Sequence, residues 1–310
     1  LRTEGSSRTV REWGDIPLAS GIVVRGSIAN TAGLTEALIQ VRATCRTPYV
    51  RISLPEERAY LFETAIQRGT PEDDIRNLLE FRMEENVPLS PRDAFFDYEI
   101  VEDDADGQLL HIGVAVYARE TIVNYYDACR GAKLMPLSFE VEADAIARAA
   151  IPEGEEGVYM ILDIGRVRSG LGIIYKHALL YTSTIDIGGQ HFSDAIRRQV
   201  GVQDDAVLTS LKNERGLLRS GGSDDVYEAL LPTVSALKDE VETRITYWNT
   251  RSIEPGVRTI EKIMLCGGSV NMAGLPEYLT EVLGIETQRV EVWSNVFAGA
   301  DMVPPIARRY

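Results

Sequence analysis

Three apolar segments of this sequence run directly into glycine-containing turns, and chemistry is most readily placed at such turns. The segments are Leu162-Asp163-Ile164-Gly165, Ile185-Asp186-Ile187-Gly188-Gly189 and Leu265-Cys266-Gly267-Gly268-Ser269. Glycines after a buried strand allow backbone amides to approach an anion closely. Helical patterns follow the second and third turns, and a helix N-terminus favours phosphate electrostatically. A single turn of this kind is common in α/β proteins and is weak evidence by itself. The occurrence of three such turns in this order is what predicts an anion site.

Asp163 is the acidic residue best placed for chemistry. It stands near the end of a strand pattern, with Gly165 and a return strand behind it, which puts its carboxylate at a hairpin tip. There it could reach the water of a bound metal or an attacking water, and Mg²⁺ with ATP would suit it. The alternative is a carboxylate that only caps a turn, and the sequence leaves both readings open. Asp186 is interpreted as structural.

Composition and motifs exclude several classes of function. The sequence contains neither of the two commonest phosphate-loop motifs. Its net charge of -15 repels nucleic acid and anionic lipid. The three cysteines and three histidines show no disulfide or metal-ligand spacing. Because no apolar run approaches the roughly 20 residues of a membrane span, we expect a cytoplasmic protein with no nucleic-acid partner and no direct membrane insertion.

The hydrophobic patterns predict an α/β protein of two lobes. A chain of 310 residues with 45% hydrophobic content can bury two cores. We place the first lobe at 1–157, with an inserted α+β subdomain at 47–134. The second lobe is placed at 158–310, with a small insertion at 201–235, because dense apolar strands begin at Val158 after a glycine-bearing acidic stretch.

Alternation and helical periodicity predict the individual elements of both lobes. Residues 1–30 are predicted as short extended pieces. Strands are predicted at 50–54, 60–66, 95–101, 110–118, 158–164, 170–175, 178–187, 260–265 and 287–292, and helices at 31–44, 234–248 and 275–283. A further helix is expected to begin with Thr70 as its cap and Pro71 at its first helical position, and to end at Pro88.

Two features of this pattern can each be interpreted in two ways. The acidic run 103–107 is predicted as a hairpin turn, because the glutamate that a calcium loop requires does not follow Gly107. Phe95, Phe96 and Tyr98 could form the wall of a peptide groove, but alternating aromatics in a strand usually pack in a core or across strands. We therefore do not count these three as site residues.

The order of the elements resembles the second half of the two-lobed, ribonuclease-H-like fold of the actin-like ATPases. Asp163 to Gly172 resembles the second phosphate motif of that superfamily, and Met264 to Gly274 its adenosine motif. Within the superfamily, related to the FtsA proteins, the chain resembles the PilM family of type IV pilus assembly proteins over nearly its whole length. The matching segments are IVVRGSIANTAG from Ile22, LLEFRMEENVP from Leu78, FFDYEIVED from Phe95, FEVEADAIARA from Phe139, IDIGGQHFSDAI from Ile185 and LCGGSVNMAGLPEYL from Leu265.

The resemblance implies a role for each candidate residue in binding ATP and Mg²⁺. Asp163 and Gly165 would face the phosphates and the metal, and Glu142 would be the connecting acidic residue. Gly188 and Gly189 would line the second hairpin. The adenosine would be contacted by Gly267, Gly268, Ser269 and Lys212.

The resemblance also implies a partner. A groove associated with the inserted subdomain would receive the N-terminal tail of a PilN-like inner-membrane protein, which would hold the chain at the inner face of the cytoplasmic membrane. Self-association is left open.

Departures from the family pattern lower the expected catalytic power. The first phosphate hairpin of the family, an Asp-Ile-Gly-Ser turn, is missing from the 310 residues, and Arg166, Val167 and Arg168 stand where small hydroxyl residues are expected. Losing one preorganised phosphate donor typically costs about 10² to 10³ in rate. We therefore predict weak or no ATP hydrolysis. The rival hypothesis is a small-molecule phosphotransferase of the same superfamily, related to sugar or acetate kinases, although no acceptor pocket is evident before Val158.

Overall fold

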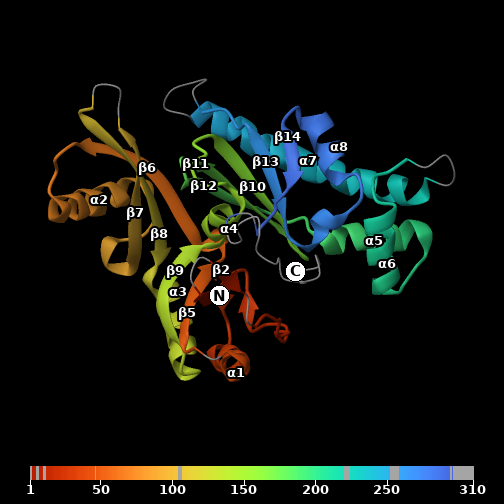
Figure 1. The fold of residues 1–310 in the computed structure, drawn as a ribbon, viewed down its shortest axis with the longest axis horizontal. Coiled ribbons are helices and arrows are strands. Elements are labelled where there is room, and N and C mark those ends of the chain that lie inside the picture. The colour runs from red at the N-terminus through yellow and green to blue at the C-terminus, as the bar shows by residue number, and fades with distance from the viewer. Residues whose placement is uncertain are drawn as a thin grey trace. The chain divides into compact units, whose positions relative to one another are not determined.

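The computed structural model of the chain forms two compact units (Figure 1). It describes residues 2–4, 7–9, 12–45, 47–103, 107–219, 224–251, 258–293 and 295. Among these, unit 1 comprises residues up to 148 together with 176–182, and unit 2 comprises 149–175 and 183–295. The predicted lobe boundaries stay a prediction.

The first part of unit 1 is a parallel strand pair covered by two helices. Strand β5 (Tyr49–Leu54) pairs with β9 (Met135–Val141), with a bulge between Val50 and Arg51. Helix α1 (Thr31–Thr44), which has the predicted bounds, packs against α3 (Arg119–Gly131), which in turn contacts β9. The apolar residues between the helices and the strands include Cys129 and Leu134. Helix α1 begins where the Asn30 side chain accepts a 2.9 Å hydrogen bond from the Gly33 amide.

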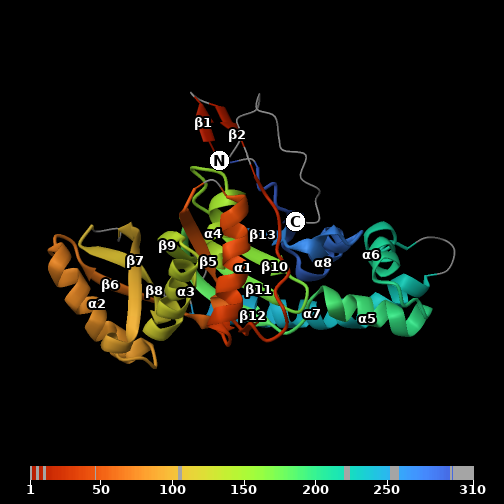
Figure 2. The same ribbon diagram turned by 90° about the horizontal axis from the view of Figure 1, so that it is seen from below.

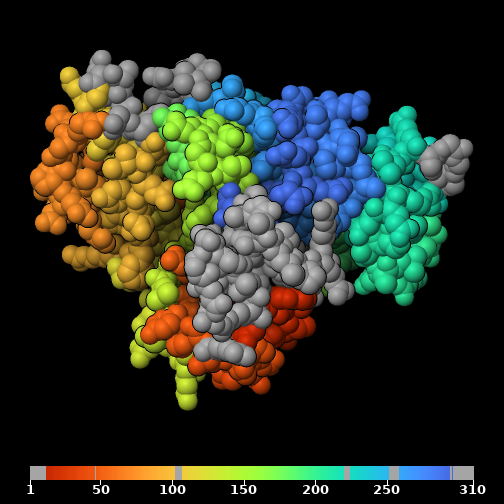
Figure 3. All heavy atoms as spheres, in the orientation of Figure 1, coloured from red at the N-terminus to blue at the C-terminus, as the bar shows by residue number. Residues whose placement is uncertain are grey.

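The second part of unit 1 is an antiparallel sheet with one helix on its face. The strand order is β6 (Ala59–Gln67), β8 (Leu109–Ala118), β7 (Ala94–Asp103). Helix α2 (Glu72–Asn86) buries Ile75, Leu79 and Met83 against this sheet. Figure 3 shows the outer surface of these elements in orange and yellow.

The start of α2 differs from the prediction. Thr70 does not cap the helix, because its hydroxyl donates to the Gln67 carbonyl at 2.6 Å. Pro71 occupies the cap position and the helix begins at Glu72. The acidic first turn of Glu72, Asp73 and Asp74 nevertheless supports the helix start through the dipole. The predicted acidic hairpin turn includes residues 104–106, which lie outside the described residues.

The remaining elements of unit 1 are short. Two-residue or three-residue strands form two antiparallel hairpins in the segment predicted as extended pieces, and helix α4 (Glu142–Ala150) follows β9 directly. The hairpins are β1 (Arg2–Glu4) with β2 (Ser7–Thr9) and β3 (Val23–Val24) with β4 (Ser27–Ile28). Single-turn helices span Glu56–Arg58 and Pro91–Asp93.

Unit 2 is built on a five-stranded sheet in the order β12, β11, β10, β13, β14. Strand β10 pairs antiparallel with β11 and parallel with β13, which pairs parallel with β14. Every residue of β10 is buried except Asp163, so the predicted apolar strand is the centre of the sheet. The bounds are β10 (Val158–Ile164), β11 (Ser169–Tyr175), β12 (Ala178–Ile185), β13 (Lys262–Cys266) and β14 (Glu286–Arg289).

Four helices accompany this sheet in the described part of unit 2. They are α5 (Gly189–Val200), α6 (Asp205–Glu214), α7 (Asp225–Arg251) and α8 (Leu275–Leu283). Helix α5 lies beside α7, as Figures 1 and 2 both show. Helix α8 has the predicted bounds and ends at Gly284, which adopts a left-handed conformation with φ of 67°.

Helix α7 begins nine residues earlier than predicted, at Asp225 instead of Val234. The sequence predicted residues 201–235 as a polar insertion that precedes this helix, and the helix in fact contains Pro232. A continuous buried stripe of Val226, Leu230, Val234, Leu237 and Val241 overrides this polar character, because its spacing of three and four residues keeps one face in the core. Among the described helices, none combines the length and the apolar character that a membrane crossing requires.

Candidate functional site

The three predicted glycine turns meet in unit 2. The carbonyl oxygen of Gly165 accepts a 2.9 Å hydrogen bond from the Gly189 amide and a 3.3 Å hydrogen bond from Ser269 Oγ. The Gln190 amide donates to the Arg166 carbonyl at 2.7 Å. The turn after β10 and the start of α5 are therefore joined through their backbones, and the turn after β13 is joined to them through the Ser269 side chain.

Glycine is required at two of these positions by the closeness of the turns. A Cβ atom at Gly188 would lie 2.5 Å from the Arg168 amide nitrogen and 2.6 Å from the Val167 carbonyl carbon, and backbone atoms cannot move aside easily. Gly267 has a φ of 87°, and a Cβ there would overlap the Asp163 carboxylate. Packing between the turns thus accounts for these glycines.

Asp163 lies at the end of β10, where the prediction placed it, and pairs in register with Cys266 of β13. Its side chain is half-buried beside Gly267. Burial raises the pKa of the Asp163 carboxyl, and hydrogen bonding with Cys266 partly offsets this. A carboxylate held in this way at the meeting point of the three turns can accept hydrogen bonds from a metal-bound water.

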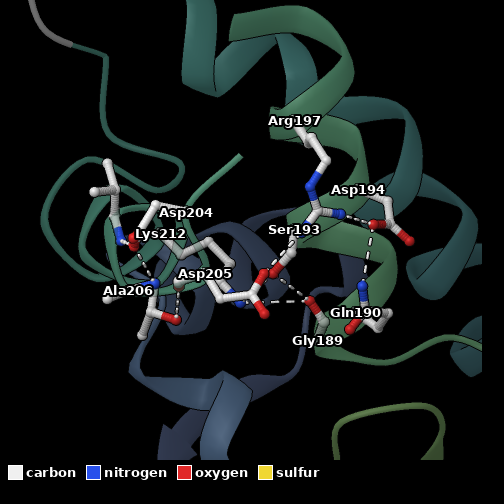
Figure 4. A network of polar contacts seen from close by, with 11 residues as sticks. Gly189, Gln190, Ser193, Asp194, Arg197, Asp204, Asp205, Ala206 and Lys212 are labelled. Carbon is white, nitrogen blue, oxygen red and sulfur yellow. Dashed lines mark hydrogen bonds and ion pairs between the residues drawn. The ribbon is translucent and has the colours of Figure 1, made fainter. Parts of the chain in front are cut away.

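The Lys212 side chain extends from α6 to the start of α5. Its ammonium group donates to Ser193 Oγ at 2.9 Å and to the Gly189 carbonyl at 3.4 Å, as Figure 4 shows. Ser193 Oγ in turn donates to the Gly189 carbonyl at 3.1 Å. Burial lowers the pKa of Lys212, with a smaller opposing effect from Asp205. Lys212 is thereby fixed at the start of α5.

The segment after α6 also lies against the third turn. The Ala273 amide donates to the Lys212 carbonyl at 3.1 Å, and the Leu217 amide donates to the Ala273 carbonyl at 2.8 Å. These bonds connect the end of α6 with the chain that follows Gly267, Gly268 and Ser269. The residues assigned to the adenosine by resemblance are therefore neighbours in the structure.

The start of α5 is poorly suited to bind a phosphate. Its first amides donate within the protein: Gly188 to His191 Nδ1 at 3.1 Å, Gly189 to Gly165, Gln190 to Arg166, and His191 to the Gly188 carbonyl at 3.0 Å. A phosphate at this helix would have to displace those bonds. These four amides are therefore not available as phosphate donors, and no hydrolytic step follows from them.

Glu142 lies in unit 1, at the first residue of α4, and its side chain is half-buried. The pKa of the Tyr117 phenol is raised chiefly by burial, and the carboxylates of Glu56 and Glu142 add to this effect. Glu142 therefore belongs to an acidic group around Tyr117. Its role toward a nucleotide stays a prediction.

Unit 1 contains a cavity whose lining includes Phe95, Phe96 and Tyr98, which were not counted as site residues. Its volume is about 410 Å³, and aromatic, aliphatic and acidic side chains of β7, β8, α3, β9, α4 and β12 line it. Phe96 and Tyr98 pack on the α2 core as predicted, but all three of Phe95, Phe96 and Tyr98 border the cavity. Packing alone is therefore an incomplete account of Phe95, which is 39% exposed.

Comparison with solved structures defines the class of protein. A structure described as a PilM-PilN type IV pilus biogenesis complex matches with a TM-score of 0.70 at 22% identity, covering 91% of this chain and 81% of that one. MreB5 of Spiroplasma citri bound to ADP matches with a TM-score of 0.53 at 15% identity, covering 91% and 77%. The same protein bound to AMPPNP gives 0.52 at 15%, covering 90% and 76%. The predicted actin-like fold is confirmed.

The sequence identifies the particular family. Residues 2–306 match the family described as type IV pilus assembly protein PilM, and the chain belongs to that family. A search of curated proteins finds no match.

Proposed function

We propose that this protein is a cytoplasmic scaffold of type IV pilus assembly that binds the N-terminal tail of a PilN-like inner-membrane protein in the cavity of unit 1. The match to the pilus assembly family over residues 2–306 carries the proposal. The similarity to a PilM-PilN complex supports the kind of partner. The cavity supports the proposed location of the tail, because apolar walls with few polar groups are typical of a ligand site. Through this partner the chain would lie at the inner face of the cytoplasmic membrane.

The second part of the proposal is that unit 2 binds ATP, with Mg²⁺, at the three joined turns. MreB5 of similar fold binds ADP and AMPPNP. Asp163 and Gly165 would lie toward the phosphates and the metal, and Lys212, Gly267, Gly268 and Ser269 toward the adenosine. Bound ATP would supply a nucleotide state that the scaffold can report to its partner. Because the α5 amides are engaged within the protein, we propose weak or no hydrolysis.

The rival phosphotransferase hypothesis is not favoured. The family match runs through both units and is to a pilus assembly protein. A coupled ADP-release assay against a panel of sugars and acetate tests this point. Turnover that depends on one of these acceptors would argue for the rival.

Tail binding is tested with a labelled synthetic peptide that carries the N-terminal tail of the PilN-like protein of the same organism. Phe95→Ala removes an aromatic wall of the cavity and should weaken binding about tenfold or more. Phe81→Ala is the matched control, because Phe81 is 61% exposed on α2 and does not line the cavity. Equal binding by both variants would place the tail elsewhere.

Nucleotide binding is tested by calorimetry with ATP, with and without Mg²⁺. Asp163→Asn should weaken binding about tenfold, or about 1.4 kcal/mol, when Mg²⁺ is present. The difference should shrink without the metal, since the lost charge acts on the metal. No binding by the wild-type chain would remove the nucleotide part of the proposal and leave the scaffold part standing.

A further inference from the structure

The turn between β10 and β11 carries two arginines at the candidate site. The last paired residues of the two strands are Ile164 and Ser169, so residues 165–168 form the turn. Arg166 and Arg168 are the only lysine or arginine residues in this turn, in the turn before α5 and in the turn after β13. Arg168 is half-buried and interacts within the protein, whereas Arg166 is exposed. Arg166 is therefore the basic residue that these turns present to solvent.

The Arg166 side chain carries an unpaired charge. Within the part of the chain that the structure describes, no hydrogen bond or ion pair involves its guanidinium group. The Asp163 carboxylate, three residues earlier, is hydrogen-bonded with Cys266 of β13 and not with Arg166. The tip of the hairpin thus holds a negative and a positive group that do not neutralise each other. A polyphosphate with a bound divalent cation matches both, because a carboxylate binds the metal or its water and a guanidinium binds two phosphate oxygens together.

The backbone that bears Arg166 is fixed on both sides. The Arg166 carbonyl accepts the 2.7 Å hydrogen bond from the Gln190 amide. The carbonyl of the preceding Gly165 accepts two hydrogen bonds, one from the start of α5 and one from the turn after β13. Beyond the turn, the buried Ser169 hydroxyl donates to the Ile187 carbonyl at 2.6 Å. A side chain on a backbone that is already ordered loses less entropy when it binds a ligand.

The usual phosphate donors of such a site are occupied. The first amides of α5 donate within the protein, and the Lys212 ammonium group donates to Ser193 and Gly189. A bound phosphate would only replace these internal bonds, so the net gain would be small. Among the described groups at the three turns, the Arg166 guanidinium is a charged donor that can bind an anion with no internal bond to break.

We infer that the Arg166 guanidinium group binds the phosphates of the nucleotide and replaces the α5 amides in this role. The inference rests on the proposed function and assigns the phosphate contact to a side chain of the β10–β11 turn. A guanidinium offers a planar pair of donors that matches two phosphate oxygens. It also supplies a local positive charge in a chain whose net charge of -15 repels anions at long range.

Arg166 has two alternative roles, and each predicts a different result. The resemblance implies small hydroxyl residues at positions 166–168, so a long side chain there can obstruct the approach of phosphates. In that case, removing the side chain should tighten nucleotide binding. An arginine that is only solvated should leave binding unchanged when it is replaced. The inferred contact predicts weaker binding, so the sign of the change in affinity separates the three roles.

The contact is tested with Arg166→Ala and Arg166→Gln by calorimetry with ATP, ADP and adenosine in the presence of Mg²⁺. We expect both variants to bind ATP and ADP about tenfold or more weakly than the wild type, because a hydrogen bond between charged groups is lost. Adenosine has no phosphate, so the two substitutions should leave its affinity unchanged. Arg166→Lys keeps the charge without the paired donors and should restore part of the affinity for ATP.

Arg198→Gln is the matched control. Arg198 is exposed on α5, eight residues or about 12 Å beyond Gln190 along the helix, and its loss removes the same charge from the same unit. Its ATP affinity should stay within about threefold of the wild type, because charges at that separation are largely screened by salt. Circular dichroism melting checks that all the variants are folded, which we expect for substitutions of exposed side chains.

The outcomes separate this inference from the proposed function. If the wild type binds ATP and Arg166→Ala binds it equally or more tightly, the phosphate contact is overturned and the nucleotide proposal stands. Equal losses of affinity in Arg166→Gln and Arg198→Gln would reveal a general effect of charge and would also overturn the contact. No binding of ATP by the wild type would remove this inference together with the nucleotide part of the proposed function.

Discussion

The Gly189 amide nitrogen donates a 2.9 Å hydrogen bond to the Gly165 carbonyl oxygen, and this contact joins the start of α5 to the turn that ends β10. Two of the three glycine turns are therefore joined by an amide donor that a phosphate would otherwise use. Ser269 Oγ, from the third turn, donates a 3.3 Å hydrogen bond to the same carbonyl oxygen. Because the Gly189 amide is already engaged within the protein, the contact supports the proposal of weak or no hydrolysis.

Gly188→Ala should disrupt this meeting of turns. The new Cβ would press on backbone atoms of Val167 and Arg168, so we expect a loss of about 1–3 kcal/mol in the free energy of unfolding. Urea denaturation measures it. Gly14→Ala is the control, because no atom lies within 4 Å of a Cβ placed there, and its effect should stay within about 0.5 kcal/mol. Equal stability of the two variants would contradict the close packing of the turns.

Asp163→Asn should change how stability depends on pH. The pKa of Asp163 is raised in the folded protein above its ordinary value of 3.8. The folded state therefore holds this proton more tightly, and the wild type loses stability as the pH rises from 3.8 through the folded pKa. The asparagine variant has no such loss. Relative to the wild type, it should be more stable at neutral pH than at pH 3.8.

Thermal melting over this pH range measures the difference between variant and wild type. Asp186→Asn, at an exposed position in the same unit, provides the control for the loss of one negative charge. A flat difference for Asp163→Asn would mean that burial does not govern its proton affinity.

The turns and the central strand of unit 2 could be predicted because their signals are local. A short apolar run such as Val158 to Ile164 that is followed closely by a glycine favours a buried strand. Gly188 and Gly267 mark sharp changes of direction within a few residues. The resemblance to a known family then supplied the proposed roles of Asp163, Lys212 and Ser269, which no local pattern defines.

The residues that line the cavity of unit 1 could not be predicted from local patterns, because the cavity depends on pairings between distant residues. Strand β9 pairs with β5 across more than eighty positions, as Leu54 does with Val141, and its proline-containing sequence shows little strand alternation. Phe95 belongs to a strand whose open edge appears only when β6, β8 and β7 are ordered in the sheet. The run of aromatic and acidic residues in FFDYE was the only signal, and core packing explained it equally well.

Leu79→Ala tests the core between α2 and the three-stranded sheet of unit 1. Leu79 is fully buried between α2 and the three-stranded sheet, so we expect a loss of about 2–5 kcal/mol in the free energy of unfolding. Leu78→Ala is the matched control on the same helix, because Leu78 is 43% exposed, and it should cost less than about 1 kcal/mol. Chemical denaturation compares the two. Similar losses would contradict the orientation of α2.

Lys212→Met tests whether the lysine serves the nucleotide or only the fold. Methionine keeps the length of the side chain and removes the donors to Ser193 and Gly189. If Lys212 also faces the adenosine, calorimetry should show a loss of about tenfold in ATP affinity. Lys262→Met is the control. Lys262 is the first residue of β13, at the opposite end of that strand from Cys266, and its ammonium group lies 3.6 Å from the Glu286 carboxylate. Its loss should leave ATP affinity unchanged. A Lys212→Met variant that is less stable yet binds ATP as the wild type does would give Lys212 a purely structural role.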